Sequence, residues 1–292
     1  MRLSVVIPTY NRSASLRQTL EALAGQDYAD YEVIVVDDAS TDDTPAMLAA
    51  QFPWARVLRH ERNRGPAAAR NRGVGVATGE VVVFTDDDCA PPADWLSLLA
   101  SGYARYPLVA GVGGYLRAPA EMERRNILAR YDWHVARGYG VGSAERLAGF
   151  DCPAGGTSNM SYRKAILDRV GGFDESFPVA AGEDADLKWR ICQAGYQLLY
   201  VPVGVLHLRR YTWRDFCRQQ INHGRGAAHF ELKYTGRRPG PGRIILRLGK
   251  RTLLLLPRLL RYKEKRMAVV ETLAGWLECW GQWLAWREGR RG

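Results

Sequence analysis

Short apolar runs alternate with amphipathic stretches through the first part of the chain. The runs LSVVI, YEVIVV and EVVVF are continuous rather than alternating in polarity, which is typical of strands that helices cover on both faces. Between them, a stripe of leucines predicts a helix that ends near Gly25, and further helices are expected from Thr44 and over 66–77. The pattern predicts an α/β fold with a mostly parallel sheet flanked by helices, similar to a Rossmann fold.

The pattern changes twice farther along the chain. After Tyr115 it weakens, with a helix expected over about 120–137, another over about 183–194 and a strand at YQLLYVP. Beyond His207 two basic amphipathic helices are expected, at about 243–262 and 266–287. We therefore predict an α/β domain over 1–208, with halves at 1–115 and 116–208, and a helical, basic, Trp-rich extension over 209–292.

Composition and charge narrow the class of protein. The 292 residues are 47% hydrophobic and 25% charged, which favours a folded core over disorder. Residues 203–292 hold 20 Lys and Arg against 6 Asp and Glu, a balance of +14, whereas residues 1–202 hold 21 against 25, a balance of −4. Five dispersed cysteines form no C-x-x-C pair, and the N-terminus shows no secretory signal, so we expect a protein that stays in the cytosol.

Acidic residues follow two of the apolar runs. Asp37 and Asp38 come directly after YEVIVV, and Asp86, Asp87 and Asp88 after EVVVF. Ligands of open α/β sheets bind beyond the carboxyl ends of the strands, and adjacent carboxylates favour a divalent counterion such as Mg²⁺ or Mn²⁺. The alternative is that both clusters are ordinary polar turns, since Asp is common there.

Six motifs bring these acids into a wider context. VVIPTYNR, VVDDASTDDT, NRGPAAARNRG, VFTDDDC, GGFDE and GEDADLKWR occur in this order over about residues 3–207. In this order they resemble the family 2 glycosyltransferases with the GT-A fold. The resemblance implies an inverting, metal-dependent enzyme that transfers a sugar from a nucleotide diphosphate donor, UDP-sugar being favoured over dTDP-sugar, to an acceptor hydroxyl. It also makes 1–115 the nucleotide-binding half and 116–208 the acceptor and sugar half.

The resemblance assigns roles to individual residues. Asp88 is implied as the chief Mn²⁺ or Mg²⁺ ligand of the D-x-D motif, with Asp86 and His207 as partners. Asp38 is implied to accept the imide N–H of a uracil or thymine base. The donor-binding residues implied as a set are Thr9, Tyr10, Arg12, Asp38, Arg70, Asp86, Gly156, Asn159 and Glu183.

Two of these assignments keep alternatives. Arg70 suits phosphate geometry, but Arg62, Arg64 and Arg72 compete for the same role. Gly155 and Gly156 fit a loop beneath the donor sugar, where small residues permit close backbone approach. His207 is also an ordinary polar residue type, and the other histidines, His60 among them, have no comparable support.

The motif GEDADLKWR supplies the expected catalytic base. The resemblance points to Asp184, which would take the proton of the acceptor hydroxyl. The alternative is that Glu183, Asp184 and Asp186 only favour the positive end of the following helix. A single base opposite the leaving group implies inversion, whereas a glycosidase would need a matched acid and base.

The C-terminal third suggests a second partner. Trp276, Trp280, Trp283 and Trp286 recur at helical spacing, and the preceding helix is rich in arginine and lysine. This pattern favours binding to an anionic membrane surface, with Glu271 and Glu278 disfavouring a transmembrane span. The alternative is packing on the α/β domain or on a second copy, as in a homodimer.

Other functions fit the sequence less well. A dehydrogenase needs G-x-G-x-x-G after the first strand, where this chain reads PTYNRS. A DNA-binding role for the basic tail is the second alternative, and we expect no nucleic-acid partner. The expected protein is thus a peripheral glycosyltransferase on the cytoplasmic face of the cell membrane, acting on a glycan or lipid-linked acceptor in cell-envelope or exopolysaccharide biosynthesis. A catalytically inactive nucleotide-sugar-binding or membrane scaffold protein is the remaining alternative.

Overall fold

The computed structural model describes residues 1–154 and 156–289. It divides the chain into two compact units. Unit 1 comprises 1–119, 133–175 and 184–209, and unit 2 comprises 120–132, 176–183 and the chain from 210 onward. The boundary at 209–210 lies next to the one expected from sequence, but unit 2 also takes two segments from within the first 208 residues, which no composition change marks.

Unit 1 contains a mixed sheet. Its order is β3-β2-β1-β4-β8-β6-β9-β5, with β7 paired to β9. The strands β1, β2, β3 and β4 are mutually parallel, whereas β8 runs antiparallel to both β4 and β6. In the described residues the strands are β1 (Leu3–Thr9), β2 (Tyr31–Asp37), β3 (Arg56–Arg59), β4 (Val81–Phe84), β5 (Cys89–Ala90), β6 (Gly111–Arg117), β7 (Arg146–Ala148), β8 (Met160–Arg163) and β9 (Leu198–His207).

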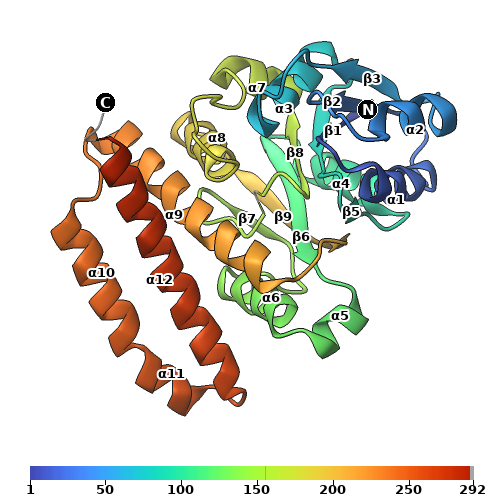
Figure 1. Ribbon diagram of the computed structural model, residues 1–292. Coiled ribbons are helices and arrows are strands. Elements are labelled where there is room, and N and C mark those ends of the chain that lie inside the picture. The colour runs from blue at the N-terminus through green and yellow to red at the C-terminus, as the bar shows by residue number, and fades with distance from the viewer. Residues whose placement is uncertain (155, 290–292) are drawn as a thin grey trace. The chain divides into compact units, whose positions relative to one another are not determined.

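Helices cover both faces of this sheet (Figure 1). One core cluster joins the strands to α1 (Ser13–Ala24), α2 (Thr44–Gln51) and α4 (Trp95–Arg105). The other joins them to α3 (Pro66–Val76), α7 (Lys164–Val170) and α8 (Glu183–Gln193). Neighbouring residues of β1 alternate between the two clusters, which explains why its apolar run is continuous. The predicted α/β sheet is therefore confirmed, with antiparallel strands added.

The helix expected over 120–137 is split in two. α5 (Ala120–Arg125) ends at Asn126, whose side-chain oxygen accepts the backbone N–H of Leu128, 2.9 Å away, at the start of α6 (Ile127–Gly138). Asparagine competes with the helix for backbone hydrogen bonds and is favoured at helix starts. The apolar spacing alone does not reveal this break.

Unit 2 is built on two long helices. α9 (Trp213–Thr235), which the sequence pattern did not predict, begins at the capping residue Thr212 and ends at Gly236. It packs against α12 (Lys265–Glu288) through two glycines. A Cβ on Gly224 would lie 2.0 Å from the carbonyl oxygen of Glu278, and one on Gly281 would lie 2.0 Å from that of Ile221. The backbones therefore approach too closely for any side chain at these two points.

The helix expected over 243–262 is also broken. α10 (Pro241–Leu253) and α11 (Leu255–Arg261) are separated at Leu254. Pro257 has no N–H for the carbonyl of Leu253 and its ring clashes with that carbonyl, which accounts for the break. None of the helices that the structure describes is long and apolar enough to cross a membrane.

Candidate active site

The acids that follow β4 lie against the loop that follows β1, both in unit 1. Loops after the parallel strands β1 and β4 meet at this edge of the sheet, and the Thr9 hydroxyl donates to Asp87, with 2.8 Å between the oxygens. Arg12, in the loop between β1 and α1, donates to Asp88 at 2.7 Å and lies 3.8 Å from Asp87. Tyr10, in the same loop, is exposed to solvent. Residues nearly eighty positions apart thus form one cluster.

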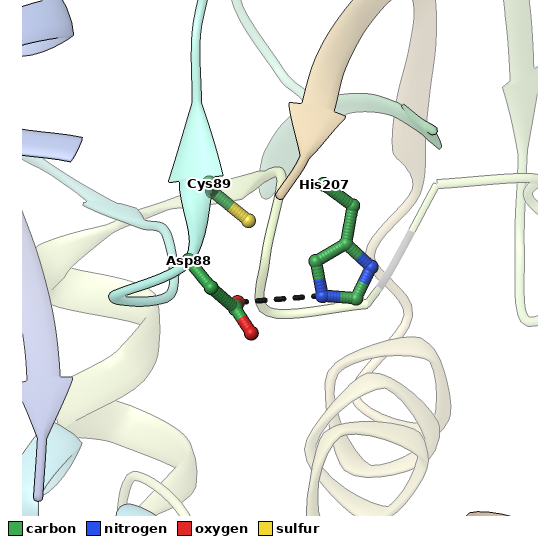
Figure 2. A group of neighbouring side chains, drawn as sticks. All are labelled: Asp88, Cys89 and His207. Carbon is green, nitrogen blue, oxygen red and sulfur yellow. Dashed lines mark ion pairs between the residues drawn. The ribbon is translucent and has the colours of Figure 1, made fainter. Parts of the chain in front are cut away.

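Asp88 is the centre of a candidate metal site (Figure 2). The Nε2 atom of His207 lies 3.3 Å from one of its carboxylate oxygens, and the thiol of Cys89 belongs to the same group. The cause is strand pairing, because Cys89 of β5 lies directly opposite His207 at the end of β9. A carboxylate and an imidazole suit a Mn²⁺- or Mg²⁺-type cation better than thiols alone do, so the donor set fits the predicted metal.

The three adjacent aspartates have different environments. Burial raises the pKa of Asp87 to about 7, and Asp88 and Asp86 add to the increase while Arg12 and Thr9 oppose it. Burial also disfavours ionised Asp88, but His207 and Arg12 outweigh this effect and lower its pKa to about 2. Asp88 is therefore the carboxylate held ready in its charged form, as a metal ligand must be.

Asp86 has partners of its own. One carboxylate oxygen accepts from Arg70 at 2.9 Å, and the other accepts from the hydroxyl of Ser158. Arg70 is almost fully buried and lies 5.7 Å from the centre of the Phe173 ring. Asp86 and Arg70 were both predicted for the donor site, and the structure joins them as a pair. The cation beside Asp88 is instead Arg12, whose side chain is half exposed.

Asp38 is buried at the end of β2. It accepts hydrogen bonds from the backbone N–H groups of Arg64 and Gly65, and the Nδ1 atom of His60 lies 2.7 Å from its Oδ1. His60 and Arg64 also line a pocket of about 450 Å³, together with Arg59, Glu61, Arg62 and Arg72. His60 therefore belongs to this site, although no motif in the sequence pointed to it. The competing arginines predicted from the sequence border the same pocket.

The loop expected beneath the donor sugar divides into two parts. Gly156 is exposed, and a Cβ placed on it would meet open space. Gly155 lies outside the described residues. Asn159 is buried: its amide accepts from the Trp95 indole at 2.8 Å and donates to the carbonyls of Tyr115 and Val203. The side chain is turned into the protein to join β6, β9 and α4, and its predicted place beside the donor stays a prediction.

The three acids at the start of α8 differ in burial. Asp186 is fully buried and pairs with Arg190 at 2.8 Å, so it has a structural role. Glu183 is buried and belongs to the 176–183 segment of unit 2. Asp184 is partly exposed. Burial raises the pKa of Tyr162, and the nearby charge of Asp184 raises it further. Tyr162 lies on β8, in register with Val82 of β4. Of the three, Asp184 is the carboxylate accessible in unit 1.

Lys188 joins α8 to the segment that contains Cys152 and Ala154. Its ammonium group donates to the backbone carbonyls of Cys152 and Ala154, at 2.6 and 2.8 Å. Burial lowers its pKa, and Cys152 and Asp184 oppose the decrease. Lys188 lies one helical turn after Asp184, so it connects the predicted base to the chain that leads into Gly156. The sequence offered no signal for this contact, since a lysine in a helix is usually solvated.

Backbone strain also concentrates at this edge of the sheet. Among the described non-glycine residues, only Asn11 and Ala39 have positive φ, 54° and 67°. Both lie just beyond parallel strands, and the side chain of Asn11 accepts from the backbone of Thr41 across the two loops. Such conformations cost about 1–3 kcal/mol each and cluster at functional sites. The two loops are thus held in one fixed arrangement.

Comparison with solved structures defines the class of this fold. It is similar to mannosyltransferase PcManGT from Pyrobaculum calidifontis, solved in complex with GDP-Man and Mn²⁺, with a TM-score of 0.64 and 22% identity over 96% of this chain and 87% of that one. It is also similar to GalNAc-T7, solved with UDP, GalNAc and Mn²⁺, with a TM-score of 0.57 and 17% identity over 78% of this chain and 47% of that one. The fold is that of a GT-A glycosyltransferase.

Sequence comparison gives the family. The family model "Glycosyl transferase family 2" matches residues 4–171, and the chain belongs to this family. It is 34% identical to the pre-mycofactocin glycosyltransferase of Mycobacterium tuberculosis, over 79% of this chain and 48% of that protein. It is 29% identical to glycosyltransferase AglE of Haloferax volcanii, over 68% of this chain and 63% of that protein. The chain thus spans about half the length of the first of these curated relatives.

Proposed function

We propose that this protein transfers a sugar from a nucleoside diphosphate donor to an acceptor hydroxyl with inversion at the anomeric carbon. The observation that carries the proposal is the pairing of Asp88 with Arg12 and His207 at the end of β4. This cluster joins a charged metal ligand, a cation for the diphosphate and the first loop of the fold in one place. The matched family and the GT-A fold support the same reaction.

The donor lies along the strand ends in this proposal. The pocket lined by His60, the partner of Asp38, receives the nucleoside, and Asp38 accepts the imide N–H of a uracil or thymine base in place of one of its present donors. Arg12 balances the diphosphate, while Arg70 holds Asp86 in position for the ribose or the metal. Asp88 and His207 would hold a Mn²⁺ or Mg²⁺ ion, which would supply Lewis-acid stabilisation of the departing diphosphate.

Asp184 is the proposed base. It accepts the proton of the acceptor hydroxyl as that oxygen attacks the anomeric carbon, and the C–O bond to the diphosphate breaks on the opposite side. Its N-terminal position on α8 places it at the positive end of the helix. The accessibility of Asp184 and the burial of Asp186 support this choice.

The cellular role is proposed more broadly. The acceptor is a glycan or a lipid-linked glycan of cell-envelope or exopolysaccharide biosynthesis, and the enzyme acts at the cytoplasmic face of the membrane. The basic C-terminal third of the sequence supports this location.

Ligand-dependent thermal unfolding tests the donor site. UDP with Mn²⁺ is expected to raise the unfolding midpoint by about 5–10 °C at roughly 100 times its Kd, and EDTA should remove the effect. GDP and dTDP in parallel assays identify the base. Asp88→Asn should abolish the metal-dependent shift, whereas Asp94→Asn, an exposed aspartate at the start of α4, should retain it. Equal shifts for Asp88→Asn and the native protein would refute the proposed metal site.

Transfer itself separates an enzyme from an inactive scaffold. Release of UDP from UDP-glucose, UDP-galactose and their N-acetyl forms is measured with and without membrane extract as the acceptor source. A protein that binds UDP with Mn²⁺ but releases none with any donor and acceptor tested would be the inactive nucleotide-sugar-binding alternative.

A further inference from the structure

α10 and α11 follow one another as one bent arm of a helical hairpin whose other arm is α12, and this arm exposes its apolar side chains. Five of them, which we call the leucine face, are 66–79% exposed: Ile245, Leu246, Leu253, Leu256 and Leu260. Four of the five follow one another at intervals of seven, three and four residues, which places them on one side of this arm. An exposed apolar stripe of this length on one side of a helix pair marks an interaction surface.

The opposite side of α10 and α11 carries arginines. Arg247 donates to Gln282 at 2.8 Å, Arg251 pairs with Glu278 at 2.9 Å, and Arg258 pairs with Glu271 at 2.8 Å. All three partners are on α12, so charge lies between the helices of unit 2 while leucines face outward. An amphipathic helix in water has the reverse arrangement. These three arginines are thus paired with side chains of α12, and Arg258 is the most buried of them.

The apolar surface continues onto α12. Val269, Trp276 and Trp280 are exposed on one stripe of that helix, and the Trp276 indole donates to the hydroxyl of Thr252 of α10 at 3.1 Å. α10 and α11 both lie alongside α12 in Figure 1. Tryptophan, with an apolar body and a polar N–H, is enriched where protein meets the boundary of a lipid bilayer.

Exposed cations border this surface. Lys250 flanks the leucine face on α10, and Arg261, Lys263, Lys265 and Arg266 cluster where α11 leads into α12. The acid within this cluster, Glu264, pairs with Arg130 of the same unit at 2.8 Å. Two copies of the chain that met through this face would bring the same cations together, whereas anionic headgroups would neutralise them. The charge pattern therefore favours lipid over a second copy.

We infer that the leucine face inserts into the surface of an anionic phospholipid bilayer, with α10 and α11 lying in the membrane plane and the cations on the headgroups. In-plane insertion is the binding mode of helices with one apolar and one polar side. This inference gives the proposed transferase its membrane contact, but it does not depend on transfer, because no donor or acceptor takes part in the binding.

Vesicle sedimentation tests the leucine face. The native protein should bind vesicles of phosphatidylcholine and phosphatidylglycerol, and a triple variant carrying Leu246→Gln, Leu253→Gln and Leu260→Gln should bind at least about a hundredfold more weakly, since each leucine buried in lipid contributes about tenfold. The matched control is Leu108→Gln, a 91% exposed leucine of unit 1, which should bind like the native protein. Equal binding by the native protein and the triple variant would overturn the inference.

Further measurements distinguish lipid insertion from unfolding and from dimerisation. Brominated lipids should quench tryptophan fluorescence of the native protein and not of the triple variant. A charge variant with Arg261→Gln, Lys263→Gln and Lys265→Gln should lose the preference for anionic over neutral vesicles. An unchanged unfolding midpoint and an unchanged UDP–Mn²⁺ shift verify that each variant is folded. If the triple variant unfolds, Leu253→Gln alone replaces it. Light scattering that shows a native dimer, a monomeric triple variant and no vesicle binding would assign the face to a second copy instead.

Discussion

The two units of this protein distribute charge in opposite ways. In unit 1, valines and leucines fill both faces of the sheet, and the charged side chains gather at the strand ends, where Asp86 and Arg12 remain accessible. In α10 and α11 of unit 2, arginines point toward α12 and leucines face outward. The comparison teaches that charge marks a ligand site where the fold leaves it accessible, not wherever the sequence concentrates it.

The largest expected effect lies at the accessible acid of α8. Asp184→Asn should lower kcat for sugar transfer by about 10²–10⁴-fold, because an amide cannot take the hydroxyl proton. UDP and Mn²⁺ should still raise the unfolding midpoint, which separates a lost base from a lost donor site. Asp94→Asn should leave kcat unchanged. Retention of native kcat by Asp184→Asn would remove this residue from the mechanism.

The next effect concerns the close packing of α12 on α9. Gly281→Leu should destabilise unit 2 by about 3 kcal/mol or more, since the new side chain meets the α9 backbone, which cannot move aside. Urea unfolding followed by circular dichroism measures this change. Gly249→Ala on α10, where a Cβ meets open space, should instead stabilise by about 0.5–1 kcal/mol. The opposite ranking would contradict the close packing of α9 on α12.

A smaller effect is expected from the inward charges. Arg258→Leu should cost about 1–3 kcal/mol, because it leaves Glu271 without this partner in a largely buried position. The double variant Arg258→Leu with Glu271→Leu should recover much of that loss, as replacement of whole buried pairs often does. Denaturant midpoints of the native protein, the two single variants and the double variant complete a double-mutant cycle. Strictly additive losses would indicate that the two side chains are not coupled.

The smallest effect sharpens the contrast with a core. Leu253→Gln should change the free energy of unfolding by less than about 0.5 kcal/mol, because this side chain is already in water in the free protein. Leu20→Gln, on the buried face of α1, should cost several-fold more. A large loss for Leu253→Gln in urea unfolding would mean that the leucine face packs within the protein.

Sequence patterns predicted the framework of unit 1 well. Continuous apolar runs, turn residues and the capping Gly25 placed β1, α1, β2, α2, α3 and β4 close to their observed bounds. Local signals of this kind depend on neighbours a few residues apart. The antiparallel insertion of β8 between β4 and β6, and the helix α9, were not predicted, because pairing and packing between distant segments decide them.

By itself, the sequence determined the α/β class, the acids at the strand ends and the family motifs, because each is written in a contiguous stretch. Only the tertiary structure decided which of those side chains remain accessible. It turned Asn159 and Asp186 inward and joined His60 to Asp38 and Cys89 to His207. It also placed the leucines of α10 and α11 on the outside. The physical reason is that burial and hydrogen bonding between distant segments depend on the whole fold, which residue spacing does not contain.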